Sequence, residues 1–139
     1  MKPRALSRGP RGLAEISRIA REARELAHAP FSGFKVGAAL RTRAGEIVTG
    51  CNVENASYGL TMCAERVAVF KAVSEGIRRF DAIAVVVDSP RPAAPCGPCR
   101  QILWEFCGDI WVRMENLRGR GFTRRMSQLL PMPFDQSNL

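Results

Sequence analysis

Three cysteines and a glutamate are the residues of this chain whose types and spacing could do chemistry. Cys63 is followed two positions later by Glu65, and Cys96 and Cys99 lie three apart within the run 95–101. Successive residues of a helix turn by about 100°, so cysteines three apart fall on one face and can hold one ion together. A cysteine and a glutamate two apart can address the same ion only from the start of a helix. We therefore expect Cys63 at a helix N-terminus, where the positive end of the helix dipole favours the thiolate that binds metal.

Zinc is the ion that this set of side chains predicts. Three soft sulfur ligands suit zinc, and three protein ligands leave a fourth tetrahedral position open to water, as in catalytic sites. Glu65 would stand beside that water without binding the metal, and could take a proton from it and deliver the proton to a substrate nitrogen. Three thiolates leave the site negatively charged, and Arg66, on the same helix face as Cys63, is placed to offset this charge. The pattern predicts a metal-assisted hydrolase.

Two other uses of these cysteines have less support in the sequence. A closed structural zinc site needs a fourth cysteine or histidine, and the spare side chains, Cys51, Cys107 and His28, have no paired spacing with either cluster. Disulfides are disfavoured because the chain has an odd number of cysteines, 5, and shows no secretory leader.

The elements around these residues predict an α/β fold, with a single domain in residues 13–139. Apolar residues recur at helical spacing after residue 12, and Pro30 ends this first helix. The continuous apolar run 83–87 is typical of a strand covered on both faces, and the strand–helix–strand order that follows predicts a parallel pair with a right-handed crossover. The expected elements are helices over 13–27, 64–75 and 97–106, strands over 34–41, 46–53, 83–87, 110–114 and 121–125, and a helical turn over 127–130.

The last strand decides the topology of the sheet. The connection 116–119 is too short for another helix, so residues 121–125 should return antiparallel to the strand before them. Arg124 and Arg125 suit an edge position better than a central one. We expect a three-layer α/β/α fold whose five-stranded mixed sheet has an antiparallel last strand.

The net charge of +8 on 139 residues raises the question of a nucleic-acid partner. The positive residues lie mainly near the two ends of the chain, and aromatic residues make up only 7% of it without alternating with basic ones. These features favour a solvated basic surface over a nucleic-acid footprint, although a nucleic-acid-binding protein on the same scaffold stays as an alternative. Residues 1–12 are interpreted as a basic, flexible N-terminal arm.

No segment of the sequence indicates a membrane partner. No apolar run is long enough to span a bilayer, and the basic start lacks the apolar centre of a signal peptide. We expect a soluble, cytoplasmic protein.

The two clusters carry a resemblance to a known family. The run Cys-Ala-Glu-Arg at 63–66, with Pro-Cys-x-x-Cys-Arg-Gln at 95–101, resembles the zinc deaminase signature, in which a glutamate that is not a ligand acts as acid and base. The segments 31–39, 52–56 and 129–131 are similar to the small homotetrameric cytidine deaminases. The likeness runs from about Leu13 to Phe134.

The resemblance implies a function and an assembly. The activity would be hydrolytic deamination of cytidine and 2'-deoxycytidine to uridine and 2'-deoxyuridine, with release of ammonia, in pyrimidine salvage. Each subunit would bind one zinc ion and one small nucleoside substrate. The subunits would form a homotetramer whose sites are shared between neighbours.

The resemblance also implies roles for polar residues outside the metal cluster. Asn52 and Glu54 would bind the sugar hydroxyls, a role that suits an amide and a carboxylate. Ala56 would contribute backbone contacts, and Tyr58 would reach the site of a neighbouring subunit. Without the resemblance, the segment 52–60 is a polar loop rich in turn-forming residues.

Three apolar residues complete the expected pocket. Phe34 would line the pyrimidine pocket, and its position also suits the core. Ala64 is small enough to let its backbone approach a base, and it also suits a plain helix. Phe134 would cross into another subunit and stack on the base, while Pro133 and the pair 127–128 depart from the family pattern there. The alternative for Phe134 is a surface anchor.

A deaminase acting on a modified cytosine nucleoside, such as blasticidin S, is the second candidate enzyme. The runs 52–55 and 63–66 favour ordinary cytidine, because the blasticidin group resembles neither run fully.

Overall fold

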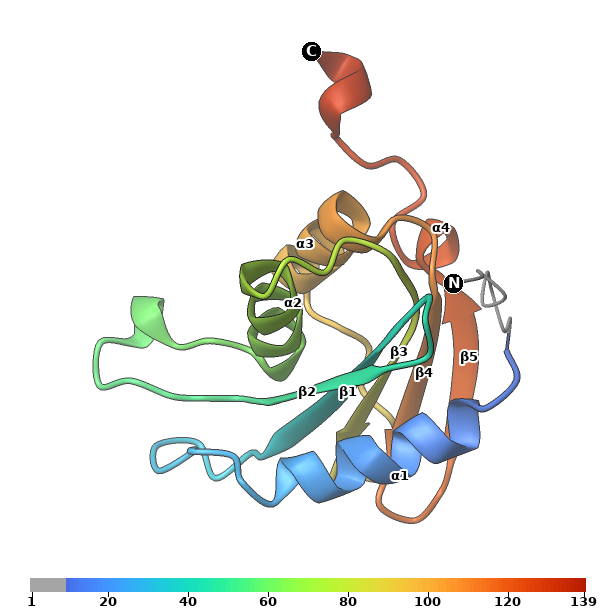
Figure 1. Cartoon of the computed structure of the whole chain (residues 1–139). Coiled ribbons are helices and arrows are strands. Elements are labelled where there is room, and N and C mark those ends of the chain that lie inside the picture. The colour runs from blue at the N-terminus through green and yellow to red at the C-terminus, as the bar shows by residue number, and fades with distance from the viewer. Residues whose placement is uncertain (1–9) are drawn as a thin grey trace.

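The computed structural model describes residues 10–139, which form one mixed sheet between two layers of helices (Figure 1). Residues 1–9, which hold most of the predicted arm at 1–12, lie outside the described residues, so the arm stays a prediction. Among residues 10–139, no helix is long and apolar enough to cross a membrane. The elements in chain order are α1 (Leu13–Arg24), β1 (Val36–Thr42), β2 (Ile47–Cys51), the 3-10 turn η1 (Tyr58–Leu60), α2 (Ala64–Ser74), β3 (Phe80–Val87), α3 (Gly97–Cys107), β4 (Trp111–Asn116), β5 (Gly121–Arg125), α4 (Met126–Leu129) and the 3-10 turn η2 (Gln136–Asn138).

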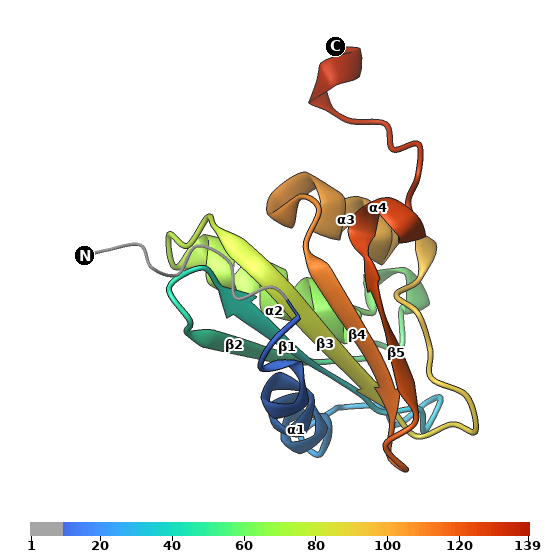
Figure 2. The same ribbon diagram turned by 90° about the vertical axis from the view of Figure 1, so that its right-hand side faces the viewer.

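The strand order across the sheet is β2-β1-β3-β4-β5, and Figure 2 shows it from one edge to the other. Only β3 and β4 run parallel, and every other pair of neighbours is antiparallel. α3 makes the crossover between the parallel strands. The three-layer fold with a five-stranded mixed sheet and an antiparallel last strand, expected from the sequence, is confirmed.

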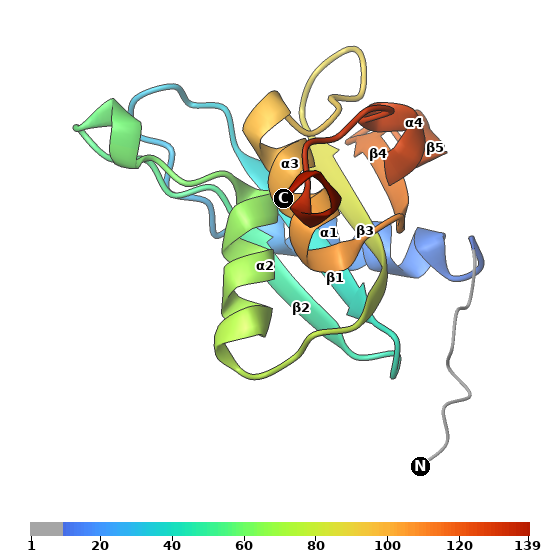
Figure 3. The ribbon, with the colours of Figure 1, turned by 90° about the horizontal axis from the view of Figure 1, so that it is seen from above.

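The two faces of the sheet carry two separate cores. Because successive strand residues point to opposite faces, β1 and β3 contribute alternate side chains to both cores. One core lies under α1, and the other lies under α2, α3 and α4, which Figure 3 shows on the opposite face of the sheet from α1. All eight residues of β3 are buried, as expected for a central strand covered on both sides.

β3 begins at Phe80, three residues before its predicted start, and further departures from the expected elements lie between α1 and β1. α1 ends at Arg24, three residues before the predicted end, and β1 begins at Val36, two residues after the predicted start. Residues 25–27 continue from α1 in turns, and His28 then pairs with the segment after β2: the His28 amide donates to the Asn52 carbonyl at 3.0 Å, and the Glu54 amide donates to the His28 carbonyl at 2.8 Å. Two long loops therefore lie side by side and project from the sheet beside α2 (Figures 1 and 3).

Candidate active site

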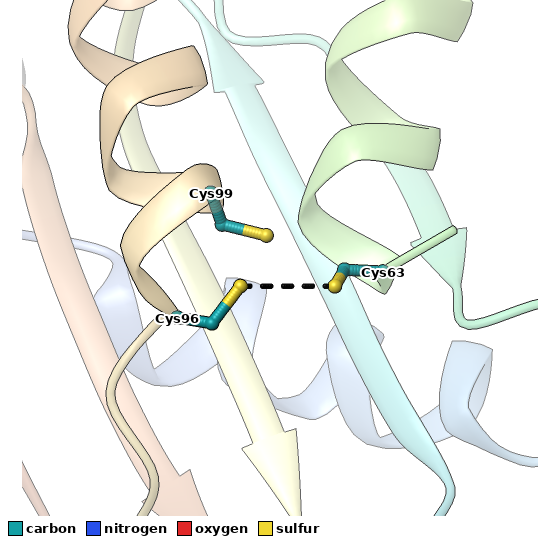
Figure 4. Close-up of side chains that lie close together, drawn as sticks. All are labelled: Cys63, Cys96 and Cys99. Atoms are coloured by element: carbon teal, nitrogen blue, oxygen red, sulfur yellow. Dashed lines mark hydrogen bonds between the residues drawn. The ribbon is translucent and has the colours of Figure 1, made fainter. Parts of the chain in front are cut away.

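The three predicted cysteines meet between the starts of two helices. Cys63 is the residue that precedes α2, Cys96 precedes α3, and Cys99 lies in the first turn of α3. Their sulfur atoms all lie within 4.8 Å of one another, and the Sγ atoms of Cys63 and Cys96 are 3.9 Å apart (Figure 4). The predicted position of Cys63 at a helix N-terminus is confirmed.

The packing of α2 on the sheet explains how Cys63 comes so close to the second cluster. Gly50 of β2 has no side chain, and a Cβ atom there would lie 2.4 Å from the carbonyl oxygen of Ala64 and 2.6 Å from the backbone nitrogen of Ala68. The first turn of α2 therefore rests directly on the backbone of β2. Neither Cys63 nor Cys96 uses its side chain to cap its helix, so both sulfurs are free to face the cluster.

Arg66 and the neighbouring thiol set the charge of the cluster. The guanidinium of Arg66 donates from Nη2 to the Cys63 Sγ at 3.2 Å. Hydrogen bonding from the Cys99 thiol, together with Arg66, lowers the pKa of Cys63 to about 5 against the opposing effect of burial. The same hydrogen bond and burial raise the pKa of Cys99. Cys63 therefore loses its proton at a lower pH than Cys99 does.

The donor set fits a zinc ion. Thiolates are the ligands that zinc prefers among protein side chains, and three of them leave one tetrahedral position open. Among residues 10–139, no histidine, aspartate, glutamate or further cysteine joins the three sulfurs. The closed four-ligand site considered for the sequence is therefore not formed by the described residues.

Glu65 lies beside the cysteines in a cavity of about 280 Å³. Its side chain is buried and is not part of the sulfur cluster. Burial raises the pKa of Glu65 to about 7, and the negative charge of Cys63 adds to this effect. A carboxyl group with such a pKa can both accept and donate a proton near neutral pH. The other predicted site residues that line this cavity are Phe34, Asn52, Glu54, Cys63, Ala64 and Cys96.

Asn52 and Glu54 join the loop before β1 to the loop before α2. The Asn52 side chain accepts from the Val36 amide at 2.8 Å and donates to the Phe34 carbonyl at 2.8 Å. Glu54 accepts from the amides of Phe31 and Ser32, at 2.9 Å and 3.1 Å, and from the Ser32 hydroxyl. These hydrogen bonds, the Ser32 hydroxyl first, lower the pKa of Glu54. Glu54 is therefore an ionised acceptor at the rim of the cavity.

Three of the predicted substrate-binding residues do not line this cavity within one chain. Tyr58 is 74% exposed and lines a second cavity of about 340 Å³, and Ala56 is exposed and lines neither cavity. Phe134 is 64% exposed in a tail that projects from the body of the molecule (Figures 1 and 2). The tail is tied to α3 by a hydrogen bond from the Gln101 side chain to the Phe134 carbonyl, at 2.8 Å.

The cavity also contains residues that the sequence did not single out. Thr61 and Met62 directly precede Cys63, so their closeness to the site could have been found from the chain itself. Val85 and Val87 come from β3, where an unbroken apolar run gives no sign of which residues face the cavity. The added lining residues are Ser32, Val36, Thr61, Met62, Val85, Val87, Ala93 and Ala94.

Residues 12–114 match the family described as "Cytidine and deoxycytidylate deaminase zinc-binding region". The chain belongs to this family. The deaminase family is a zinc-binding one, and Cys63, Cys96 and Cys99 are the ligands that hold zinc in this chain. The resemblance found in the sequence is thereby confirmed.

Individual members of the deaminase family are similar over most of the chain. A cytidine deaminase of Sporosarcina psychrophila is 49% identical over 120 residues, which are 86% of this chain and 88% of that protein. The crystal structure of a cytidine deaminase from Burkholderia pseudomallei matches with a TM-score of 0.84 and 48% identity, covering 87% of this chain and 98% of the other. A blasticidin-S deaminase of Bacillus cereus is 34% identical over 110 residues, covering 73% of this chain and 78% of that protein.

Proposed function

We propose that this chain is a zinc-dependent deaminase that hydrolyses cytidine and 2'-deoxycytidine to uridine and 2'-deoxyuridine and releases ammonia. The observation that carries the proposal is the buried carboxyl of Glu65, which lines the same cavity as the sulfurs of Cys63 and Cys96. Family membership and the similarity to cytidine deaminases support the same substrate class.

Glu65 carries the protons of this reaction. A zinc ion held by the three cysteines would supply a Lewis acid that makes water a better nucleophile near neutral pH. The Glu65 carboxylate takes a proton from the attacking water and delivers it to the ring nitrogen N3 of the base. As the water oxygen bonds to C4 and the bond to the amino group breaks, Glu65 passes the second proton to that nitrogen, which leaves as ammonia. A pKa of about 7 suits a group that must act first as a base and then as an acid.

The remaining cavity residues bind and orient the nucleoside. Phe34 and the backbone at Ala64 contact the pyrimidine ring, while Asn52 and Glu54 face the sugar. Ala56 adds backbone contacts from the same loop. The guanidinium of Arg66 offsets the negative charge of the Cys63 thiolate, which reduces the repulsion between the cluster and the electron-rich base.

The same cavity is proposed to be completed by other copies of the chain in a homotetramer. Tyr58 and Phe134 are large, apolar and exposed in the single chain, which supports a role for both at a subunit boundary. In this assembly Tyr58 approaches a neighbouring site, and Phe134 stacks on the base bound by another subunit.

Parallel incubations of the purified protein with cytidine, 2'-deoxycytidine and blasticidin S test the substrate. We expect ammonia release and loss of cytosine absorbance with the two simple nucleosides. The identity of 49% to a cytidine deaminase, against 34% to the blasticidin-S enzyme, favours the simple nucleosides over blasticidin S as substrates. Turnover of blasticidin S alone would assign the chain to the modified-nucleoside branch, and binding of nucleic acid in a gel shift without any turnover would overturn the enzyme proposal.

A further inference from the structure

The loop 31–34 is wrapped around the carboxylate of Glu54. Glu54 Oε1 accepts from the amides of Phe31 at 2.9 Å and Ser32 at 3.1 Å, and Oε2 accepts from the Ser32 hydroxyl. No helix or strand contains these four residues, and the loop is held against the rest of the site by Glu54 and by the Asn52 side chain, which donates to the Phe34 carbonyl at 2.8 Å. The carboxylate and the loop therefore fix each other.

The Ser32 hydroxyl is the centre of this arrangement. Its oxygen accepts from the Phe34 amide at 2.9 Å, and because a backbone N–H can only donate, the single hydroxyl proton is free for Glu54. Gly33, with a φ of 69°, makes the left-handed turn that folds the loop between Ser32 and Phe34. One hydroxyl thus links the carboxylate at one end of the cavity to Phe34, which lines the same cavity.

Ser32 and Glu54 also lie between two cavities. Both residues line the cavity of about 280 Å³ that holds Glu65 and the cavity of about 340 Å³ that holds Tyr58. They come from the two loops that lie side by side in Figures 1 and 3. The two residues are therefore part of the boundary that the two cavities share.

The acceptor capacity of Glu54 limits what it can bind. A carboxylate has about four lone-pair directions, so three protein donors leave it able to accept from about one more hydroxyl. The direction of that last acceptor site is set by the donors that hold the carboxylate, and the Ser32 hydroxyl is the only side chain among them.

We propose that Ser32 is a positioning residue that aims Glu54 at a single ring hydroxyl, 2' or 3', of the nucleoside sugar. The proposal rests on the proposed function, in which Glu54 binds the sugar. Ser32 does not take part in proton transfer, so its loss should weaken substrate binding without slowing the chemical step.

Steady-state kinetics of Ser32→Ala with cytidine tests this role. We expect KM to rise by about 10-fold to 100-fold, the usual effect of losing a hydrogen bond to a charged group, while kcat stays within about 3-fold of the wild-type value. Ser32→Thr keeps the hydroxyl and should retain most of the affinity. Ser74→Ala is the matched control, because Ser74 is an exposed serine at the far end of α2 whose hydroxyl bonds only to the Lys71 carbonyl in the described residues.

A substrate without the 2'- and 3'-hydroxyls of the sugar separates positioning from general damage. 2',3'-Dideoxycytidine keeps the 5'-hydroxyl and lacks both ring hydroxyls, so Glu54 has no ring hydroxyl to accept from, and most of the KM difference between wild type and Ser32→Ala should disappear. In a Glu54→Gln background, Ser32→Ala should likewise add little to the KM for cytidine.

Three results would overturn the proposal: an unchanged KM for Ser32→Ala, an equal rise with both substrates, or full additivity with Glu54→Gln. Failure of the proposed function would look different, because the wild-type protein itself would then release no ammonia from cytidine.

Discussion

Glu65 is the side chain on which the chemistry depends most directly. We expect Glu65→Gln to lower kcat by about three orders of magnitude or more, because an amide of the same shape cannot shuttle protons. The variant should keep its zinc, because Glu65 is not among the sulfur ligands. Ammonia release and the zinc content of the purified protein measure the two effects. Glu75→Gln, an exposed glutamate at the end of α2, is the control. Turnover close to wild type would remove Glu65 from the mechanism.

The burial of Glu65 also predicts how stability depends on pH in protein stripped of metal. Its pKa is raised from 4.5 to about 7, so between these values the folded state binds the proton more tightly than the unfolded state. The stability that protonated Glu65 contributes is therefore fully present below the unfolded-state pKa of 4.5, and it is lost as the pH rises through the folded-state pKa of about 7. At about pH 8, metal-free Glu65→Gln should be more stable than metal-free wild type by roughly 3 kcal/mol, and near pH 4 this difference should vanish.

Urea unfolding of both chelator-treated proteins, under reducing conditions at the two pH values, measures the difference. If the stability difference between the two proteins does not change with pH, the pKa of Glu65 is not raised in the folded state.

At the scale of single elements, α3 connects the metal cluster to the C-terminal tail. Arg100 donates from Nε to the Pro95 carbonyl and from Nη1 to the Leu129 carbonyl, both at 2.8 Å. Four residues further along α3, the Trp104 ring nitrogen donates to Asp135 at 2.8 Å. The helix whose first turn supplies Cys99 therefore also fixes the loop before Cys96 and the segment that carries Phe134.

Removing the Arg100 contacts should loosen the metal. We expect Arg100→Met to release zinc to a coloured chelator about 10-fold faster, since residues that support metal ligands typically contribute 10-fold to 100-fold to affinity. Arg91→Met removes the same charge from the exposed part of the preceding loop, where no other described residue makes an ion pair with Arg91, and serves as the control. Equal release rates for the two variants would show that Arg100 does not support the cluster.

The elements were predictable where a local rule was sufficient. The spacing of Cys96 and Cys99 required a helical turn, and the two-residue gap between Cys63 and Glu65 required a helix start; both helices begin where these rules put them. The short connection after β4 was enough to predict the antiparallel β5.

The lining of the cavity could not be predicted in the same way, because it depends on contacts between distant segments. Ser32, Thr61, Val85 and Ala93 come from four separate parts of the chain and meet only through the sheet pairing and the loop contacts. Nothing in the local sequence of Ser32 shows that its hydroxyl reaches a carboxylate 22 positions away. The pairing of His28 with the loop after β2 has the same origin, because it joins segments that are distant in the sequence.

At the scale of the whole molecule, the exposed aromatic residues make the strongest case for an assembly. Phe31 and Tyr58 meet edge to face at 6.1 Å on the projecting loops, and Phe134 is exposed in the C-terminal tail. Because the proposed homotetramer uses Tyr58 and Phe134 across subunit boundaries, a single copy would bind cytidine weakly. Light scattering during gel filtration should give the mass of a tetramer, and Phe134→Ala should raise KM for cytidine, whereas Met132→Ala, 92% exposed in the same tail, should not.

Mixing two defective variants tests whether sites are shared. Glu65→Gln lacks the proton carrier but has Phe134, and Phe134→Ala lacks the aromatic ring but has Glu65. If Phe134 acts in a neighbouring subunit, random mixed tetramers contain complete sites at about a quarter of positions, so co-refolded or co-expressed mixtures should regain high-affinity turnover that neither variant has alone. If mixed tetramers form and show only the low-affinity activity contributed by the Phe134→Ala subunits, Phe134 acts within its own chain or not at all. The same result would assign the tail to a surface role, because in one described chain Phe134 does not line the cavity that holds Glu65.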